Sequence, residues 1–150
     1  MGVGSSLFDA AKAGDYAHAQ CQSLLREGHQ LDLDSPLRVA ALQGKTEVCS
    51  LLLHHGANID SKNVNGFTAM ILASQQGHSD TVKMLHERGA DVFATNRQDA
   101  GAVHMASQNN RAETVQYLVE QAGVGVDTVS GLRSLYLTHT IYPCIVTAKH

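Results

Sequence analysis

A repeat of 33 residues constrains the fold of this chain more than any other feature of its sequence. Each period has the same order: a pair of small residues, then a glycine or an asparagine, then an apolar run. A fixed period of this length is typical of a supersecondary unit that buries its apolar face by stacking on copies of itself. The equivalent positions are Pro36, Ala69 and Ala102, followed by Gly44, Gly77 and Asn110.

Within one period, the apolar residues predict two short helices. Gly44 separates them, and a glycine or an asparagine at this place tolerates the left-handed backbone of a tight turn. Gly56-Ala57 and Gly89-Ala90 predict a left-handed end to the second helix, and Asn65-Gly66 predicts a turn before the next pair. The apolar residues fall at helical spacing, at Leu37, Ala40 and Ala41 and then at Val48, Cys49, Leu52 and Leu53.

Stacking such units places equivalent apolar residues beside one another. Leu52, Leu85 and Leu118 are 33 residues apart and predict one column of the core, and Cys49 begins a second column with Val82 and Val115. Cys49 is therefore expected to be an inert buried thiol rather than a nucleophile.

The segments "SPLRVAALQGK…LLLHHGA" and "TAMILASQQGH…MLHERGA" resemble the ankyrin repeat, whose pattern is TPLH-xAA-xxGH…LLL-xxGA. The resemblance implies an all-α ankyrin-repeat solenoid of helix-turn-helix units, with projecting hairpin loops that form a concave face with the first helices. His104 keeps the histidine of the pattern, which implies a structural hydrogen bond there. The expected domain spans residues 1–130, with a divergent first unit at about 5–34, units at about 35–61, 62–94 and 95–128, and an incomplete repeat or irregular tail at 131–150.

Composition and charge exclude several classes of function. The chain has 11 basic and 14 acidic residues and a net charge of -3, so it lacks the positive field that binding to nucleic acid requires. Its apolar stretches are too short to span a bilayer, and its start lacks the features of a secretory signal. Three cysteines at unrelated spacings favour reduced thiols. We expect a cytoplasmic, possibly nuclear, protein that is not secreted.

Nothing in the sequence indicates catalysis. No GxSxG, GxGxxG, P-loop or HExxH motif occurs. His54 and His55 are adjacent on the second helix, so their side chains point in different directions and do not form a metal site. The chain is therefore predicted to be no enzyme, with no cofactor, no metal and no small-molecule substrate.

The predicted function is that of a monomeric, non-catalytic module that binds another protein. The resemblance places the partner-binding positions on the loops and along the first helices. Phe67 has two interpretations: it could anchor a partner, or it could fold back and fix its loop to the neighbouring repeat. The predicted binding residues are Leu42, Gln43, Val64, Asn65, Phe67, Gln75, Gln76, Arg97, Gln98, Ala100, Gln108 and Asn109.

Two alternatives stay open. The start "MGVGSS" fits the N-myristoylation motif, which would make Gly2 a lipidation site and the chain a membrane-tethered adaptor. The same Ser6 is also explained as a helix cap with Asp9, without any lipid. The second alternative is a regulatory ankyrin fragment of a longer enzyme or channel, since such arrays often accompany other domains.

Overall fold

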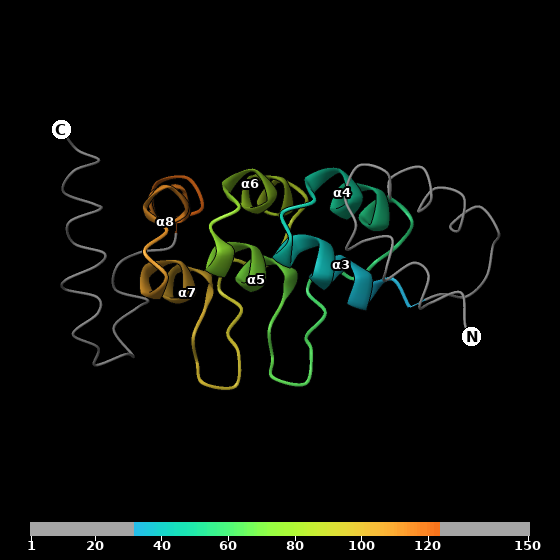
Figure 1. Ribbon diagram of the computed structural model, residues 1–150, viewed down its shortest axis with the longest axis horizontal. Coiled ribbons are helices and arrows are strands. Elements are labelled where there is room, and N and C mark those ends of the chain that lie inside the picture. The colour runs from blue at the N-terminus through green and yellow to red at the C-terminus, as the bar shows by residue number, and fades with distance from the viewer. Residues whose placement is uncertain (1–31, 124–150) are drawn as a thin grey trace.

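Three pairs of helices make up the described part of the chain. The computed structural model describes residues 32–123. The first helices of the pairs lie side by side in one layer, and the second helices form a layer above them (Figure 1). The helix-turn-helix repeat that the period predicts is confirmed. The pairs are α3 (Asp34–Leu42) with α4 (Thr46–His54), α5 (Ala69–Gln76) with α6 (Ser79–Glu87), and α7 (Ala102–Gln108) with α8 (Ala112–Glu120).

The helices begin and end at residues suited to those positions. Thr68 caps the start of α5, where its hydroxyl accepts a hydrogen bond from the backbone N–H of Ile71 at 3.3 Å. The turn between the helices of each pair has a left-handed residue at the predicted place, with φ of 72° at Gly44, 79° at Gly77 and 60° at Asn110. These left-handed turns let each second helix fold back on the first.

Two long loops connect the pairs and project from the layer of first helices (Figure 1). Loop A, residues 55–68, joins α4 to α5, and loop B, residues 88–101, joins α6 to α7. The backbone N–H of Arg97 in loop B donates to the carbonyl of Asn65 in loop A at 3.1 Å, so the loops lie against each other. Residues 32–123 contain no named strand, and the pairing within loop B is an isolated antiparallel bridge between Thr95 and Gly101. The projecting hairpin loops are thus built from turns.

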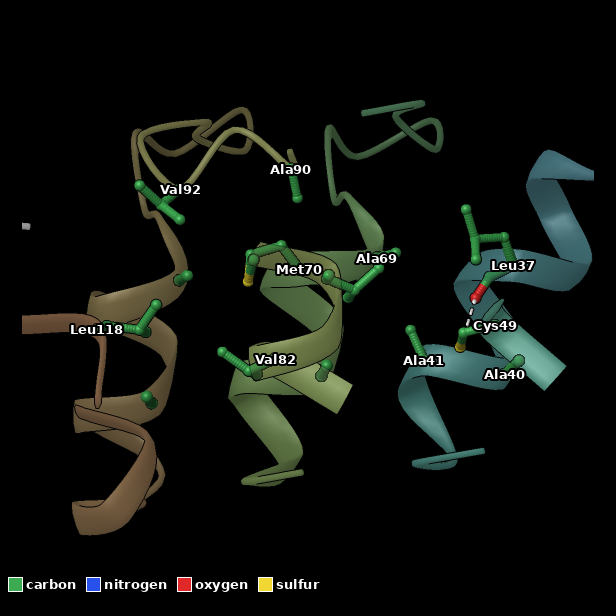
Figure 2. Close-up of a cluster of buried hydrophobic side chains, with 14 of the residues drawn as sticks. Leu37, Ala40, Ala41, Cys49, Ala69, Met70, Val82, Ala90, Val92 and Leu118 are labelled. Atoms are coloured by element: carbon green, nitrogen blue, oxygen red, sulfur yellow. Dashed lines mark hydrogen bonds between the residues drawn. The ribbon is translucent and has the colours of Figure 1, made fainter. Parts of the chain in front are cut away.

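The core is a set of columns that run through the stacked repeats. Leu52, Leu85 and Leu118 are all fully buried and belong to one apolar cluster, as the period predicts. Figure 2 shows side chains of this cluster projecting from successive helices toward one another. Each repeat therefore supplies part of the core of its neighbour.

The second column begins at Cys49, which is also fully buried. Its thiol faces the carbonyl oxygen of Leu37, with the sulfur 4.0 Å from that oxygen (Figure 2). Burial raises the pKa of the Cys49 thiol to about 12. The thiolate is the nucleophilic form, so this group is unreactive at neutral pH, as predicted.

Hydroxyl groups link the second helices of adjacent repeats. The side-chain oxygens of Thr46 and Thr81 are 2.8 Å apart, and those of Ser79 and Thr114 are 3.1 Å apart. Because the hydroxyls within each pair bond to each other, these polar residues carry little desolvation penalty in the interface.

Side chains in the turns also close the ends of the first helices. Nε2 of His78 donates to the carbonyl of Leu42 at 3.0 Å, and Nε of Arg111 donates to the carbonyl of Gln75 at 3.3 Å. The last carbonyls of a helix have no partner within that helix. Here the following repeat supplies one.

Replacing Ser74 with alanine is expected to raise the free energy of unfolding by about 1 kcal/mol, and the same holds for Ser107. Both hydroxyls are buried without a hydrogen-bond partner among the described residues, whereas the equivalent position in α3 is already Ala41. Thermal unfolding of Ser74→Ala measures the effect. Ser79→Ala is the matched control, because its hydroxyl contacts Thr114, and this change should lower the melting temperature. Destabilisation by Ser74→Ala would contradict the assignment of an unsatisfied hydroxyl.

Candidate functional site

One asparagine side chain holds the tip of loop A in shape. Oδ1 of Asn63 accepts hydrogen bonds from the backbone N–H groups of Asn65 and Phe67, both at 2.9 Å. The backbone N–H of Asn63 donates to the carbonyl of Phe67 at 3.0 Å, which closes the hairpin. The backbone between these residues is therefore fixed, and the side chains at the tip are presented in one arrangement.

Asn96 does the same in loop B. Its Oδ1 accepts from the N–H groups of Gln98 at 2.9 Å and Ala100 at 3.0 Å, and its own N–H donates to the carbonyl of Ala100 at 3.0 Å. Sequence reasoning missed both asparagines. The sequence contained a sign of their role, because an asparagine occurs at the same position of two consecutive periods, at Asn63 and at Asn96.

Asn96→Ala is expected to speed the hydrogen exchange of the backbone amides of Gln98 and Ala100, by about tenfold or more, because both amides lose their acceptor. The amides of Asn65 and Phe67 should keep their rates, since Asn63 holds them independently. Asn63→Ala is the reciprocal control and should reverse the pattern. Exchange that rises equally in both loops after either change would show that the loops open as one unit.

Four of the six predicted binding positions in the loops are exposed. The side chain of Val64 is 77% exposed, which makes it the most exposed large apolar residue among residues 32–123. Asn65 in loop A and Arg97 and Gln98 in loop B are exposed as well. An apolar side chain on a hydrogen-bonded loop tip loses little conformational freedom when it is buried against another surface.

Ala100, one of the predicted binding residues, is buried rather than exposed. Its exposed fraction is 7%, because both backbone groups of Ala100 bond to Asn96 and the hairpin turns its methyl group inward. There it joins a small cluster with Ile71 and Met105. Phe67 is half-buried and packs against the same cluster. This packing agrees with the interpretation in which Phe67 folds back and fixes loop A to the neighbouring helices.

The ends of the first helices carry a row of amide side chains, the amide row, which consists of Gln43, Gln75, Gln76, Gln108 and Asn109. Gln75 is half-buried and the other four residues are exposed; the neighbouring Leu42 is half-buried. Nδ2 of Asn109 donates to the carbonyl of Met105 at 2.8 Å. The four glutamine side chains make no hydrogen bond within residues 32–123. Their donors and acceptors are available to a ligand.

Groups that could support other chemistry have structural roles or lie outside the described residues. Nδ1 of His104 accepts from the backbone N–H of Gly101 at 3.0 Å, in agreement with the structural hydrogen bond that the family pattern implies. Between residues 32 and 123, no three His, Cys, Asp or Glu side chains gather as metal ligands. In the same range, no helix has both the length and the apolar character to cross a membrane. The predicted lipidation site Gly2 and the predicted tail at 131–150 lie outside this range.

Comparison with known families decides between this fold and other helical repeats. A sequence model described as "Ankyrin repeats (3 copies)" matches residues 7–96, which is more than half of the chain. The chain belongs to the ankyrin-repeat family. The last helical pair that the structure describes, α7 and α8, lies beyond the matched residues and continues the same array. Ankyrin repeats are generally protein-interaction modules and are typically not catalytic.

A plant protein is similar to part of this ankyrin chain. The "E3 ubiquitin-protein ligase XBAT33" of Arabidopsis thaliana is 37% identical over 75 residues, which cover 47% of this chain. The aligned part is 15% of the ligase, so the chain spans only a small fraction of the length of this relative.

Proposed function

We propose that this ankyrin chain is a non-catalytic module that binds a partner protein through the loop tips and the amide row together. The observation that carries the proposal is the contrast between two sets of positions. Equivalent core positions hold similar buried residues, as at Leu52, Leu85 and Leu118. At the loop tips, equivalent positions hold different residues, as at Val64 and Arg97. The amide row instead repeats its residue type, as at Gln43 and Gln76. The loop tips therefore vary on a repeated scaffold, and such variation is what a binding surface needs for selectivity.

The two parts of this surface offer complementary contacts. Val64 supplies an apolar group that is fixed by the hydrogen bonds around Asn63. The four glutamines of the amide row supply donors and acceptors that no other described residue uses. Apolar anchors surrounded by adaptable polar groups are the usual composition of a protein interface.

Site-directed crosslinking tests the proposal. A photo-crosslinking amino acid is placed at residue 64 of the full chain in cells, and at residue 116 on α8 as the matched control. We expect residue 64 to capture a protein that residue 116 does not capture, and we expect Gln43→Ala combined with Gln108→Ala to abolish the capture. Capture that occurs equally at both residues, or that survives the double change, would refute this surface.

Val64→Ala is expected to weaken binding of the captured partner by about tenfold while the free energy of unfolding changes by less than about 0.5 kcal/mol. Phe67→Ala should instead lower that free energy by about 1–3 kcal/mol, because its ring packs against Ile71 and Met105. Urea unfolding and a binding titration on both variants separate the two roles. A stable Phe67→Ala variant with lost binding would favour Phe67 as the anchor.

A second candidate is that the chain acts as the ankyrin part of a larger enzyme. The similarity to one segment of a ubiquitin ligase favours it. An antibody against residues 32–123 tests this candidate in cells of the source organism. A product longer than 150 residues would support it, and a product of this length alone would exclude it.

A further inference from the structure

Asn65 differs from the other asparagines of the chain in what holds its side chain and in the residue that follows it. Within residues 32–123, the side chain of Asn65 makes no hydrogen bond, and the residue is exposed. Asn110 also lacks a side-chain hydrogen bond in this range, but Arg111 follows it, whereas Gly66 follows Asn65. In the others the side chain is hydrogen-bonded, at Asn58, Asn63, Asn96 and Asn109.

An exposed asparagine before a glycine can lose its amide without an enzyme, because glycine has no side chain that obstructs the attack. The backbone nitrogen of Gly66 gives up its proton to base in the solvent and attacks Cγ of Asn65, and ammonia leaves as the Cγ–Nδ2 bond breaks. Water then opens the succinimide ring. If the bond from this nitrogen to Cγ breaks, the product is aspartate; if the bond to the backbone carbonyl carbon breaks, it is isoaspartate.

The hydrogen bonds at the tip of loop A restrain this reaction. The N–H of Gly66 donates to the carbonyl of Asn63 at 2.9 Å, which holds the proton that must be lost. Oδ1 of Asn63 accepts from the N–H groups of Asn65 and Phe67, on either side of Gly66, both at 2.9 Å. The nitrogen of Gly66 therefore becomes reactive when the tip opens, and the frequency of opening sets the rate.

Loop B provides a comparison within the same molecule. Gln98 and Asp99 lie one period after Asn65 and Gly66, and the tip is held by an equivalent asparagine, Asn96. The backbone is left-handed at both second positions, with φ of 56° at Asp99 and 84° at Gly66. A glutamine would have to close a ring that is one atom larger, and the side chain of Asp99 obstructs the attack. Loop B thus has a similar tip without the reactive pair.

We propose that Asn65 is a site of spontaneous deamidation that is restrained by Asn63, and that isoaspartate at this site separates loop A from loop B. The carbonyl of Asn65 accepts from the N–H of Arg97 at 3.1 Å, and a Cβ on Gly66 would lie 2.9 Å from that nitrogen. Isoaspartate adds a methylene group to the backbone at this close contact, so the hydrogen bond cannot keep its geometry. The chemistry is independent of the proposed function, but its product lies in the proposed binding surface, next to Val64.

Incubation of the full chain at mildly alkaline pH, followed by peptide mass spectrometry, tests the proposal. We expect residue 65 to change from amide to acid before any other asparagine does, and residue 98 to keep its amide. An isoaspartate-specific methyltransferase should label the same peptide, and Asn65→Gln should remove the label. In the isoaspartate form, the backbone amide of Arg97 should exchange with solvent about tenfold faster or more, because it loses its acceptor.

Changes in the two tips test the restraint. Asn63→Ala should speed the conversion of Asn65 by about fivefold or more, since two hydrogen bonds that keep the tip closed are lost. Asn96→Ala is the matched control in loop B and should leave that rate unchanged. Gln98→Asn combined with Asp99→Gly should make residue 98 a second site of conversion, without any change in loop A.

Three results would overturn the proposal. They are an Asn65 that keeps its amide while another asparagine converts, a rate that Asn63→Ala and Asn96→Ala raise equally, and an Arg97 amide that is equally protected before and after isoaspartate forms. Each leaves the proposed function standing, because capture of a partner at residue 64 of the unmodified chain tests that function separately.

Discussion

Truncating Leu85 to alanine is expected to lower the free energy of unfolding by about 2–5 kcal/mol. Leu85 is fully buried in α6, and its column has a leucine on each side, Leu52 in one neighbouring repeat and Leu118 in the other. The change would leave a cavity between Leu52 and Leu118, at both interfaces of the repeat formed by α5 and α6. Movement of one neighbouring repeat alone could not fill this cavity. Urea unfolding followed by circular dichroism gives the value.

The matched control is Met84→Ala, one residue earlier in the same helix. Met84 is half-buried and packs at the edge of the core cluster, so its truncation should cost clearly less. Hydrogen exchange adds a second readout, since Leu85→Ala should weaken the protection of α4 and α8 as well as that of α6. If Leu85→Ala and Met84→Ala lowered the free energy of unfolding equally, the leucine column would not be the main interaction that holds the repeats together.

Gly66→Ala is expected to destabilise the protein by roughly 2–4 kcal/mol, through a left-handed backbone and a steric clash together. Gly66 has a φ of 84°, and a Cβ built there would lie 2.9 Å from the backbone nitrogen of Arg97 and 3.0 Å from Cα of Asn96. Those atoms belong to loop B, so the clash would push the two projecting loops apart. Thermal unfolding measures the loss of stability.

Gly89→Ala isolates the backbone contribution. Gly89 has nearly the same φ, 89°, but a Cβ there would meet nothing within 4 Å. This variant should lose only about 1 kcal/mol, the usual cost of a left-handed residue that is not glycine. If the two alanine variants were equally stable, the loops would be free to move apart and the contact between Asn65 and Arg97 would contribute nothing.

The sequence could predict the features that follow from the period. Helix pairs, left-handed turns and buried columns recur every 33 residues, so a single pattern of apolar and small residues determines them together. Residues such as Leu85 and Gly77 were therefore assigned correctly. Each has counterparts one period away with the same role, which is burial for Leu85 and a left-handed turn for Gly77.

The candidate site was harder to predict because exposure on a loop depends on how the backbone turns. Ala100 and Val64 both lie in projecting loops, yet Asn96 turns Ala100 inward while Val64 stays 77% exposed. A periodic pattern does not contain this information. The unsatisfied hydroxyl of Ser74 was hard to predict for a similar reason. The sequence shows that a serine is present, but it does not show whether the hydroxyl has a hydrogen-bond partner once it is buried.

The links between repeats have a consequence for how such a chain lengthens in evolution. The hydroxyl pairs join residues 35 apart, and the turn side chains reach carbonyls 36 residues earlier. Because each bond spans about one period, tandem duplication of a whole period within the gene would recreate every bond at the new junction. An insertion of any other length inside the helical pairs would shift donors from their acceptors and leave these hydroxyls and carbonyls without their partners. Arrays of this kind are therefore expected to gain or lose length in whole units, with shorter insertions tolerated in the projecting loops.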